Sequence, residues 1–514
     1  MNQENLNKSS SAEGAPKTHA VASDRPVGRP VPGKFVTGSL RRHILVMTGT
    51  SAFGLMAIFV GDLANILFLS MLNDTRLVAA VGFASSIVFV MISIGIGMSI
   101  GATALIAPEL GLGNRELARR YAIHAVLLTA VVAALASAVV WIAAPWLLSL
   151  LGADGATRDF ALTYTRILLL AAPALAVGMT CAGILRSVGD AKRAMYVTLI
   201  GAVVNVTLDP ILIFWAELEL TGAALATFCA RITVMSVGLY GVMSVHDLLG
   251  RPDAATFTDD ARRQAKVSVP AMATNLATPF ANAYITAAIA AFGDAAVAGW
   301  AIVGRVQPVA FGAIYALSGA IGPIVGQNYG AREGDRMRET YVEGLWVTGA
   351  FTLAAWALLA LFAGQIVSAF QATGETADLI RLFCYGLAPL FFFLGMLFVT
   401  NAVLNTLGRA TTSTALNWGR ATIGTVPFVW VGGNLGGASG VLIGWMLGGI
   451  AFGLLAAWYC GRHIDQLHAT MTEQRGPHRD APLTSDATNL PDNLAKKPSA
   501  EAANPSADKP QRTA

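Results

Sequence analysis

The chain has 514 residues, of which 54% are hydrophobic and only 13% are charged. Because soluble globular proteins carry about 25% charged residues, this composition, with a mean hydropathy of +0.57, indicates an integral membrane protein. The net charge is +4 and the basic residues are spread among loops, so nothing points to a nucleic-acid partner. The four cysteines lie far apart in apolar runs and are expected to be buried small side chains.

Twelve apolar runs predict an all-α membrane protein with twelve transmembrane helices. Each run is near or above the roughly 20 residues that cross a bilayer. The predicted spans are 43–71, 78–107, 121–151, 160–185, 193–216, 220–245, 265–292, 295–327, 340–371, 377–406, 411–432 and 437–462. The polar segments 1–40 and 464–514 are predicted to be disordered tails, and residues 1–40 contain no apolar core of a cleavable signal peptide.

The loops between the spans alternate in charge, which predicts the orientation of the chain. Basic residues gather in the loops that would be cytoplasmic, for example Arg115, Arg119 and Arg120, whereas the opposite loops are short and rich in acids such as Asp154. Since cytoplasmic loops carry an excess of Lys and Arg, both tails are predicted to lie in the cytoplasm of a multi-pass inner-membrane protein.

The two halves of the membrane part resemble each other in sequence. The segment that begins Gly113-Asn-Arg-Glu is matched by Gly330-Ala-Arg-Glu, and Leu185-Arg-Ser-Val-Gly is matched by Leu404-Asn-Thr-Leu-Gly. Six spans per repeat is an even number, so the repeats run parallel to each other. The sequence therefore predicts two pseudo-symmetric six-helix lobes around a central cleft, an N-lobe at 41–250 and a C-lobe at 251–463, with substrate and ion sites between or within the halves.

Two acids within apolar runs are the strongest candidates for a functional site. Asp62 lies in the first run and Asp209 in the fifth, and inserting a carboxylate there costs a few kcal/mol. Asn205 precedes Asp209 by four residues and shares its helix face, and Thr227 lies at a similar depth, roughly 10–14 Å below the outer surface. Two carboxylates, an amide and a hydroxyl suit a proton or a hard cation, so H+ or Na+ is expected to bind at these four residues.

The repeat provides an internal comparison for this site. The positions in the second half that correspond to Asp62 and Asp209 fall in windows without an acid, so the cation site is predicted in the first half alone. The second half instead has neutral polar residues within its spans. Substrate contacts in the cleft and hydrogen bonds between helices remain alternatives for Asn275, Asn282, Gln307 and Asn401.

These residues, in this order within twelve spans, resemble the multidrug and toxic compound extrusion family over about residues 43–462. The resemblance is carried by Ala80-Val81-Gly82, the segments that begin at Gly113 and Gly183, the Asn205-xxx-Asp209-Pro210 element, Thr221-Gly222-Ala223 and Gly326-Gln327-Asn328-Tyr329. It implies two six-helix lobes around a cleft and cation-coupled antiport of organic, often cationic, substrates. In its DinF-like branch the cation site corresponds to Asp62, Asn205, Asp209 and Thr227, although the proline typical of the first helix is absent here.

The hypothesis from the sequence is a secondary active transporter, not an enzyme, that exports small organic compounds and uses H+ or Na+ as coupling ion. A monomer in membrane lipid with no other cofactor is expected. One alternative is a lipid-linked oligosaccharide flippase, which would line its cavity with cations, and only Arg166, Arg231, Arg305 and Arg420 are available. A remote alternative is an intramembrane aspartyl protease, but the contexts of Asp62 and Asp209 lack the Tyr-Asp and Gly-x-Gly-Asp elements of that class.

Overall fold

A computed structural model describes residues 33–72 and 74–475, and over these residues the secondary structure is helical, without a strand. The helices of the first half begin at Leu40 and end at Val245: α1 Leu40–Ser70, α2 Thr75–Leu112, α3 Arg115–Leu150, α4 Gly155–Leu170, α5 Ala172–Val188, α6 Ala191–Pro210, the π-helix η1 Ile211–Trp215, α7 Glu219–Tyr240 and the π-helix η2 Gly241–Val245. The second half comprises α8 Ala254–Ala290, α9 Asp294–Ala310, α10 Gly312–Gly330, α11 Gly334–Ala369, α12 Gly374–Leu382, η3 Phe383–Leu387, η4 Ala388–Leu390, α13 Phe391–Thr406, α14 Ala410–Ala421 and α15 Val426–Arg475.

Eight of the described helical segments are long and apolar enough to cross a membrane, or ten if each bent pair counts as one crossing. The bent pairs are α4 with α5 and α9 with α10, which meet at 46° and 47°. α8 adds a further long helix, whose first turns are polar. The last of the eight segments, Ala410–Glu473, is itself two crossings, because the chain reverses within α15.

Glycines show where α15 reverses. Gly436 and Gly437 leave the helical conformation, and on either side the two arms approach backbone to backbone. A Cβ on Gly440 would lie 1.9 Å from the carbonyl oxygen of Gly432, and one on Gly448 would lie 1.4 Å from that of Gly424. Only glycine permits two helices to pack so closely. With this hairpin the helices form the twelve crossings that the sequence predicts.

The internal repeat extends to the helix boundaries. α2, α3, α4 and α6 begin at residues 75, 115, 155 and 191, and α9, α11, α12 and α14 begin at 294, 334, 374 and 410, so each pair is displaced by 219 residues. The connections repeat as well: Gly155 and Gly374 both have φ of 54°, and Gly189 and Gly408 have φ of 86° and 75°. The displacement of 219 pairs Asp62 with Ala281 and Asp209 with Phe428, so the second half carries no acid at these positions.

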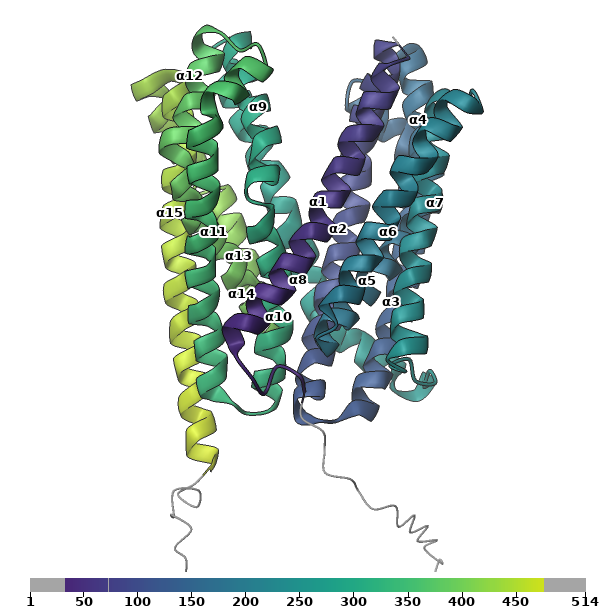
Figure 1. Ribbon diagram of the computed structural model, residues 1–514, viewed down its shortest axis with the longest axis vertical. Helices are drawn as coiled ribbons and strands as arrows, with labels where there is room; N and C mark the ends of the chain where they lie inside the picture. Colours follow the sequence, from purple (N-terminus) through teal and green to yellow (C-terminus); the bar gives the residue numbers. More distant parts are fainter. Residues whose placement is uncertain (1–32, 73, 476–514) are drawn as a thin grey trace, which may run out of the picture. The chain divides into compact units, whose positions relative to one another are not determined.

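Helix α1 connects the two halves. It packs against α10 and α11 of the second half and against α6 of the first half. Figure 1 shows it running obliquely from α10 and α11 towards α6. Ile44 and Met47 at its start belong to a buried apolar cluster with residues of α10, including Leu317. Gly54 packs on α6, where a Cβ would lie 2.3 Å from the Thr198 hydroxyl oxygen. The helix is continuous, in keeping with the absence of proline.

The two halves are joined at the end of the molecule that carries the basic loops. α2 packs against α8 and α10 there, again through glycines. A Cβ on Gly111 would lie 2.0 Å from the Gln327 carbonyl oxygen, and one on Gly330 would lie 1.9 Å from that of Pro108. Because both contacts are to backbone, no side chain can be added at either position unless the helices separate. This end is therefore tightly closed.

The segment before α1 strengthens the same junction. Phe35 is 1% exposed; its N–H donates to Gln327 Oε1 at 2.8 Å, and Gln327 Nε2 donates to the Ser187 carbonyl at 2.6 Å. Lys34 Nζ donates to the Gly189 carbonyl at 2.7 Å. The segment 33–39 is thus anchored to the helices at Lys34 and Phe35, although the sequence predicted a disordered tail up to residue 40.

The C-terminal boundary also differs from the prediction. α15 continues to Arg475, beyond the predicted start of the tail at residue 464. The other tail residues, 1–32 and 476–514, lie outside the described part of the chain. A compact unit that ends at His468 holds both lobes.

Candidate functional site

Asp209 is the most enclosed carboxylate of the predicted site. It lies near the end of α6 and is 0% exposed. Asn65 Nδ2 donates to both of its oxygens, each at 3.1 Å, and Asn205 Nδ2 donates to Oδ2 at 2.9 Å. A buried carboxylate requires such donors, because without them its removal from water is uncompensated. Two neutral amides therefore satisfy the hydrogen bonds of Asp209, but they supply no positive charge.

The local sequence explains how these groups meet. Asn205 and Asp209 are one helical turn apart on the same face of α6. Pro210 follows at once and ends the regular α-helix, and the π-helix η1 continues the chain. A proline lacks the N–H that would bond to Val206, so a change in helical geometry is expected at this point. Asn65 comes from α1, which packs along α6.

Asp62 lies three residues before Asn65 on α1, and it differs from Asp209 in its environment. Its side chain is exposed, whereas Asn65 is 6% exposed. It is within electrostatic reach of Asp209 and of the guanidinium of Arg231. The two acids thus share one neighbourhood.

Arg231 and Tyr164 complete this neighbourhood, and neither was predicted to belong to it. Arg231 on α7 is 7% exposed and donates from Nη1 to the Leu168 carbonyl at 2.9 Å. Tyr164 on α4 is 6% exposed; its hydroxyl is hydrogen-bonded to Thr227 and lies within electrostatic reach of both acids and of Arg231. Thr227 is therefore connected to the two acids by way of the Tyr164 hydroxyl.

The charges of the site do not balance. Asp62 has the cation Arg231 within electrostatic reach, whereas within residues 33–72 and 74–475 no Lys, Arg or His forms an ion pair with Asp209. The described residues hold no group of three His, Cys, Asp or Glu side chains that could bind a metal ion. The donor set is instead two carboxylates with amides and hydroxyls, which suits a proton or a monovalent cation.

Helical spacing could have revealed two of the site residues that were not predicted. Asn65 lies three residues after Asp62, and Arg231 lies four residues after Thr227, so each shares a helix face with a predicted residue. Tyr164 offers no comparable signal, because it lies on α4, a helix without another site residue. Its place in the site is a consequence of tertiary packing.

The four candidates in the second half do not form one cluster. Asn401 is buried, and its Oδ1 accepts from Ser413 Oγ at 3.0 Å and from Asn417 Nδ2 at 2.8 Å, so it links α13 to α14. Asn275 donates to the Ala271 carbonyl of its own helix at 2.9 Å. Asn401 thus makes hydrogen bonds between helices, whereas the bond of Asn275 lies within its own helix.

The other two candidates are more accessible. Gln307 on α9 donates from Nε2 to the Tyr315 hydroxyl at 3.2 Å, and it is half-buried. Asn282 on α8 is exposed. Neither contacts the acids of the first half.

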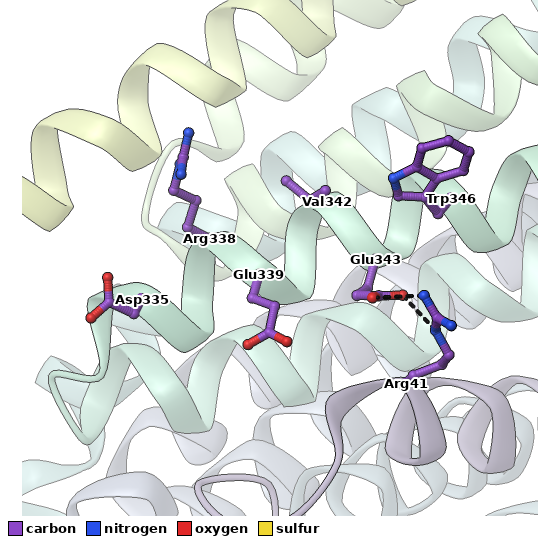
Figure 2. Close-up of a pocket in the computed structure, with 7 residues that line it drawn as sticks. All are labelled: Arg41, Asp335, Arg338, Glu339, Val342, Glu343 and Trp346. Carbon is purple, nitrogen blue, oxygen red and sulfur yellow. Dashed lines mark hydrogen bonds and ion pairs between the residues drawn. The ribbon is translucent and has the colours of Figure 1, made fainter.

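A surface pocket lies elsewhere, between the start of α1 and α11. Figure 2 shows Arg41 directed at Glu343, with Nε to Oε2 at 3.0 Å, and Trp346 close by on α11. Its rim includes Asp335, Arg338 and Glu339 and is strongly charged. This pocket contains none of the predicted site residues.

The fold and the site define a multi-pass membrane protein with twelve crossings in two related halves and a buried carboxylate, Asp209, within one half. The MatE family model matches residues 51–211 and 270–431, which is more than half of the chain. The chain therefore belongs to the MATE family of membrane transporters, as its sequence motifs indicate, and a protease is set aside.

Two similar proteins have assigned functions. The chain is 28% identical over 447 residues to a FAD transporter of Shewanella oneidensis, covering 85% of this chain and 98% of the relative. It is 24% identical over 418 residues to the multidrug export protein MepA of Staphylococcus aureus, covering 77% and 87%.

Solved structures show the same fold. A point mutant of the MATE transporter VcmN of Vibrio cholerae aligns with a TM-score of 0.80 at 25% identity and covers 84% of this chain and 98% of its own. A MATE transporter in an outward-facing conformation aligns with a TM-score of 0.79 at 22% identity, covering 85% and 98%.

Proposed function

We propose that this transporter is a secondary antiporter that exports organic compounds in exchange for H+ or Na+ bound at Asp62, Asn205, Asp209 and Thr227. The observation that supports this function is Asp209: a fully buried carboxylate, hydrogen-bonded to two amides and paired with no cation among the described residues. A buried charge of this kind is costly unless a counter-charge or a proton neutralises it. The coupling ion supplies that neutralisation.

Helix α1 is the element through which ion binding acts on the rest of the protein. It carries Asp62 and Asn65 into the site and also packs against α10 and α11 of the C-lobe. Neutralising Asp209 weakens its hydrogen bonds to Asn65, because bonds to a charged acceptor are roughly twice as strong as neutral ones. The position of α1 against α6 then depends on the ion, and the equilibrium between two arrangements of the lobes shifts with it.

The closed end of the molecule bears the basic loops, so the positive-inside rule makes it the cytoplasmic side of the inner membrane. Access to the site in this arrangement is therefore from the outside. The exposed side chain of Asp62 supports this, since an ion arriving from outside would meet it before Asp209. Binding of the ion would precede inward opening and the loading of substrate.

The experiment imposes H+ and Na+ gradients separately on everted vesicles and follows the transport of two probes, a cationic dye and FAD. These probes reflect the relatives, a multidrug exporter and a FAD transporter. Transport of at least one probe that depends on one gradient and disappears when the gradient is dissipated is the expected result. Transport that is indifferent to both gradients would contradict the coupling.

A further inference from the structure

Arg420 is a buried cation in the C-lobe that the coupling site does not use. It lies on α14 and is 5% exposed. Its Nη2 donates to the Thr278 hydroxyl on α8 at 3.3 Å, and the Tyr315 hydroxyl on α10 lies within electrostatic reach. Its Nε is buried and donates to no acceptor within the described residues.

The comparison with Arg231 shows what is unusual about Arg420. Arg231 is equally buried but has Asp62 within electrostatic reach and a carbonyl acceptor, whereas the described residues provide no ion pair for Arg420. A buried guanidinium without a carboxylate is costly, and each of its N–H groups requires an acceptor. An anion would supply both the charge and the acceptor.

The repeat places Arg420 at a position related to the coupling site. A displacement of 219 residues pairs it with Gly201 on α6, one turn before Asn205. The equivalent helices of the two lobes thus carry polar groups of opposite charge: a carboxylate on α6 and a guanidinium on α14. The C-lobe contains no acid at the positions paired with Asp62 and Asp209.

A ligand can reach this guanidinium from the side of Thr278. On α8, the residues seven before and seven after Thr278 are Ala271 and Ile285, which share its face and are both 0% exposed. Thr278 is nevertheless exposed. On this face of α8, the residue that contacts Arg420 is therefore uncovered by protein, between two fully buried positions.

Tyr315, whose hydroxyl lies within electrostatic reach of Arg420, belongs to a group of aromatic side chains. Tyr315 accepts a hydrogen bond from Gln307 and is half-buried, and its ring lies 5.2 Å from that of Phe398, also half-buried. Phe391 adds an edge-on contact to Tyr315, with ring centroids 6.3 Å apart. Aromatic faces beside a guanidinium suit a ligand that carries an aromatic ring together with an anionic group.

We propose that Arg420, with Thr278, forms the recognition site for the phosphate or carboxylate of an aromatic organic anion, and that such anions are the substrates of this transporter. This assignment rests on the proposed export function and names its substrate class. It replaces the expectation of a cationic substrate. The guanidinium binds the anionic oxygens, and the ring packs beside Tyr315.

The test compares two probes that differ in a single phosphate, FMN and riboflavin. Their affinities are measured by flavin fluorescence with the full chain in phosphatidylcholine nanodiscs, without any ion gradient. A charge-assisted contact to phosphate should make FMN bind at least about tenfold more tightly than riboflavin. In Arg420→Gln, the affinity for FMN should fall to that for riboflavin, while the affinity for riboflavin should equal that of the unaltered protein.

Two further variants control for charge and folding. Arg305→Gln removes an exposed arginine of the same lobe and should retain the preference for FMN. Arg420→Lys keeps the charge and should retain most of the preference for FMN over riboflavin. Thermal unfolding reports whether Arg420→Gln is folded; if that variant does not fold, the comparison of the two probes on the unaltered protein and on Arg420→Lys decides.

Equal affinities of FMN and riboflavin for the unaltered protein would overturn the proposal, as would an Arg420→Gln variant that still prefers FMN. Repeating the measurement with phosphatidylglycerol distinguishes a second source of the anion. If this lipid abolishes the preference, the site binds a lipid headgroup and the proposal fails. Since binding is measured without a gradient, an error in the proposed ion coupling leaves these outcomes unchanged.

Discussion

Substituting Asp209 by asparagine separates the charge of the site from its hydrogen bonds. The carboxylate accepts three N–H contacts, of which two, from Asn205 at 2.9 Å and Asn65 at 3.1 Å, converge on Oδ2. An asparagine with its carbonyl oxygen in the place of Oδ2 keeps both of these as weaker bonds to a neutral acceptor. Its NH2 group takes the place of Oδ1 and faces Asn65 Nδ2, so the third bond is lost and two donors oppose each other unless Asn65 turns. The substitution therefore removes the charge and keeps part of the hydrogen-bond network.

Two energies of similar size oppose each other. A lost hydrogen bond to a charged acceptor costs about 1.5–3 kcal/mol, and the two remaining bonds to Oδ2 weaken as well. Removing an ionised Asp from a membrane-buried helix returns about 2.5–3.5 kcal/mol. We therefore expect Asp209→Asn to unfold at a temperature close to that of the unaltered protein.

Transport should respond very differently from stability. Without a titratable oxygen or a negative charge at position 209, gradient-driven transport should fall to the background of vesicles that lack the protein. The assay is efflux of the responsive probe from everted vesicles, with protein amount checked by immunoblot. Asp294→Asn, an exposed acid at the start of α9, serves as control and should transport normally. Undiminished coupled transport by Asp209→Asn would refute the reasoning.

Two other substitutions test the neighbouring contacts. Arg231→Gln should lower the unfolding temperature, because Asp62 loses its cation, and adding Asp62→Asn should restore part of the loss in a double-mutant cycle; strict additivity of the two changes would show that the residues do not interact. Gly330→Ala should destabilise the protein and impair transport, because its Cβ would lie 1.9 Å from a backbone oxygen. Gly319→Ala on the same helix meets nothing within 4 Å and should be neutral or stabilising. Equal effects of the two alanines on the unfolding temperature would count against the closed junction.

Much of the architecture could be predicted from the chain because a membrane imposes strong local rules. Length and apolarity set the spans, and the charge alternation and the repeated motifs set the two lobes. The last hairpin shows the limit of these local rules. α15 is one helical segment by hydrogen bonding, and the close backbone contacts of Gly432 with Gly440 show that the chain reverses within it.

The site was predictable only where an unusual residue type marked it. Asp62 and Asp209 stand out because an acid in an apolar span is costly, and Asn205 follows from helical spacing. Arg231 was instead considered among the arginines available to line a cavity, and its proximity to Asp62 depends on how α7 packs against α1. Packing of the segment before α1 was missed, because its polar composition is also that of a disordered tail.

That packed segment has a practical consequence for anyone who works with the protein. Phe35 is bonded through its N–H to a glutamine of the C-lobe, and Lys34 beside it is bonded to a carbonyl of the N-lobe. An affinity tag or fluorescent fusion that replaces residues 33–39 would remove these bonds to both lobes, even though every transmembrane helix would be intact. Expression vectors should therefore retain residues 33–39, and truncations that start at residue 40 should not be used as the reference for transport rates.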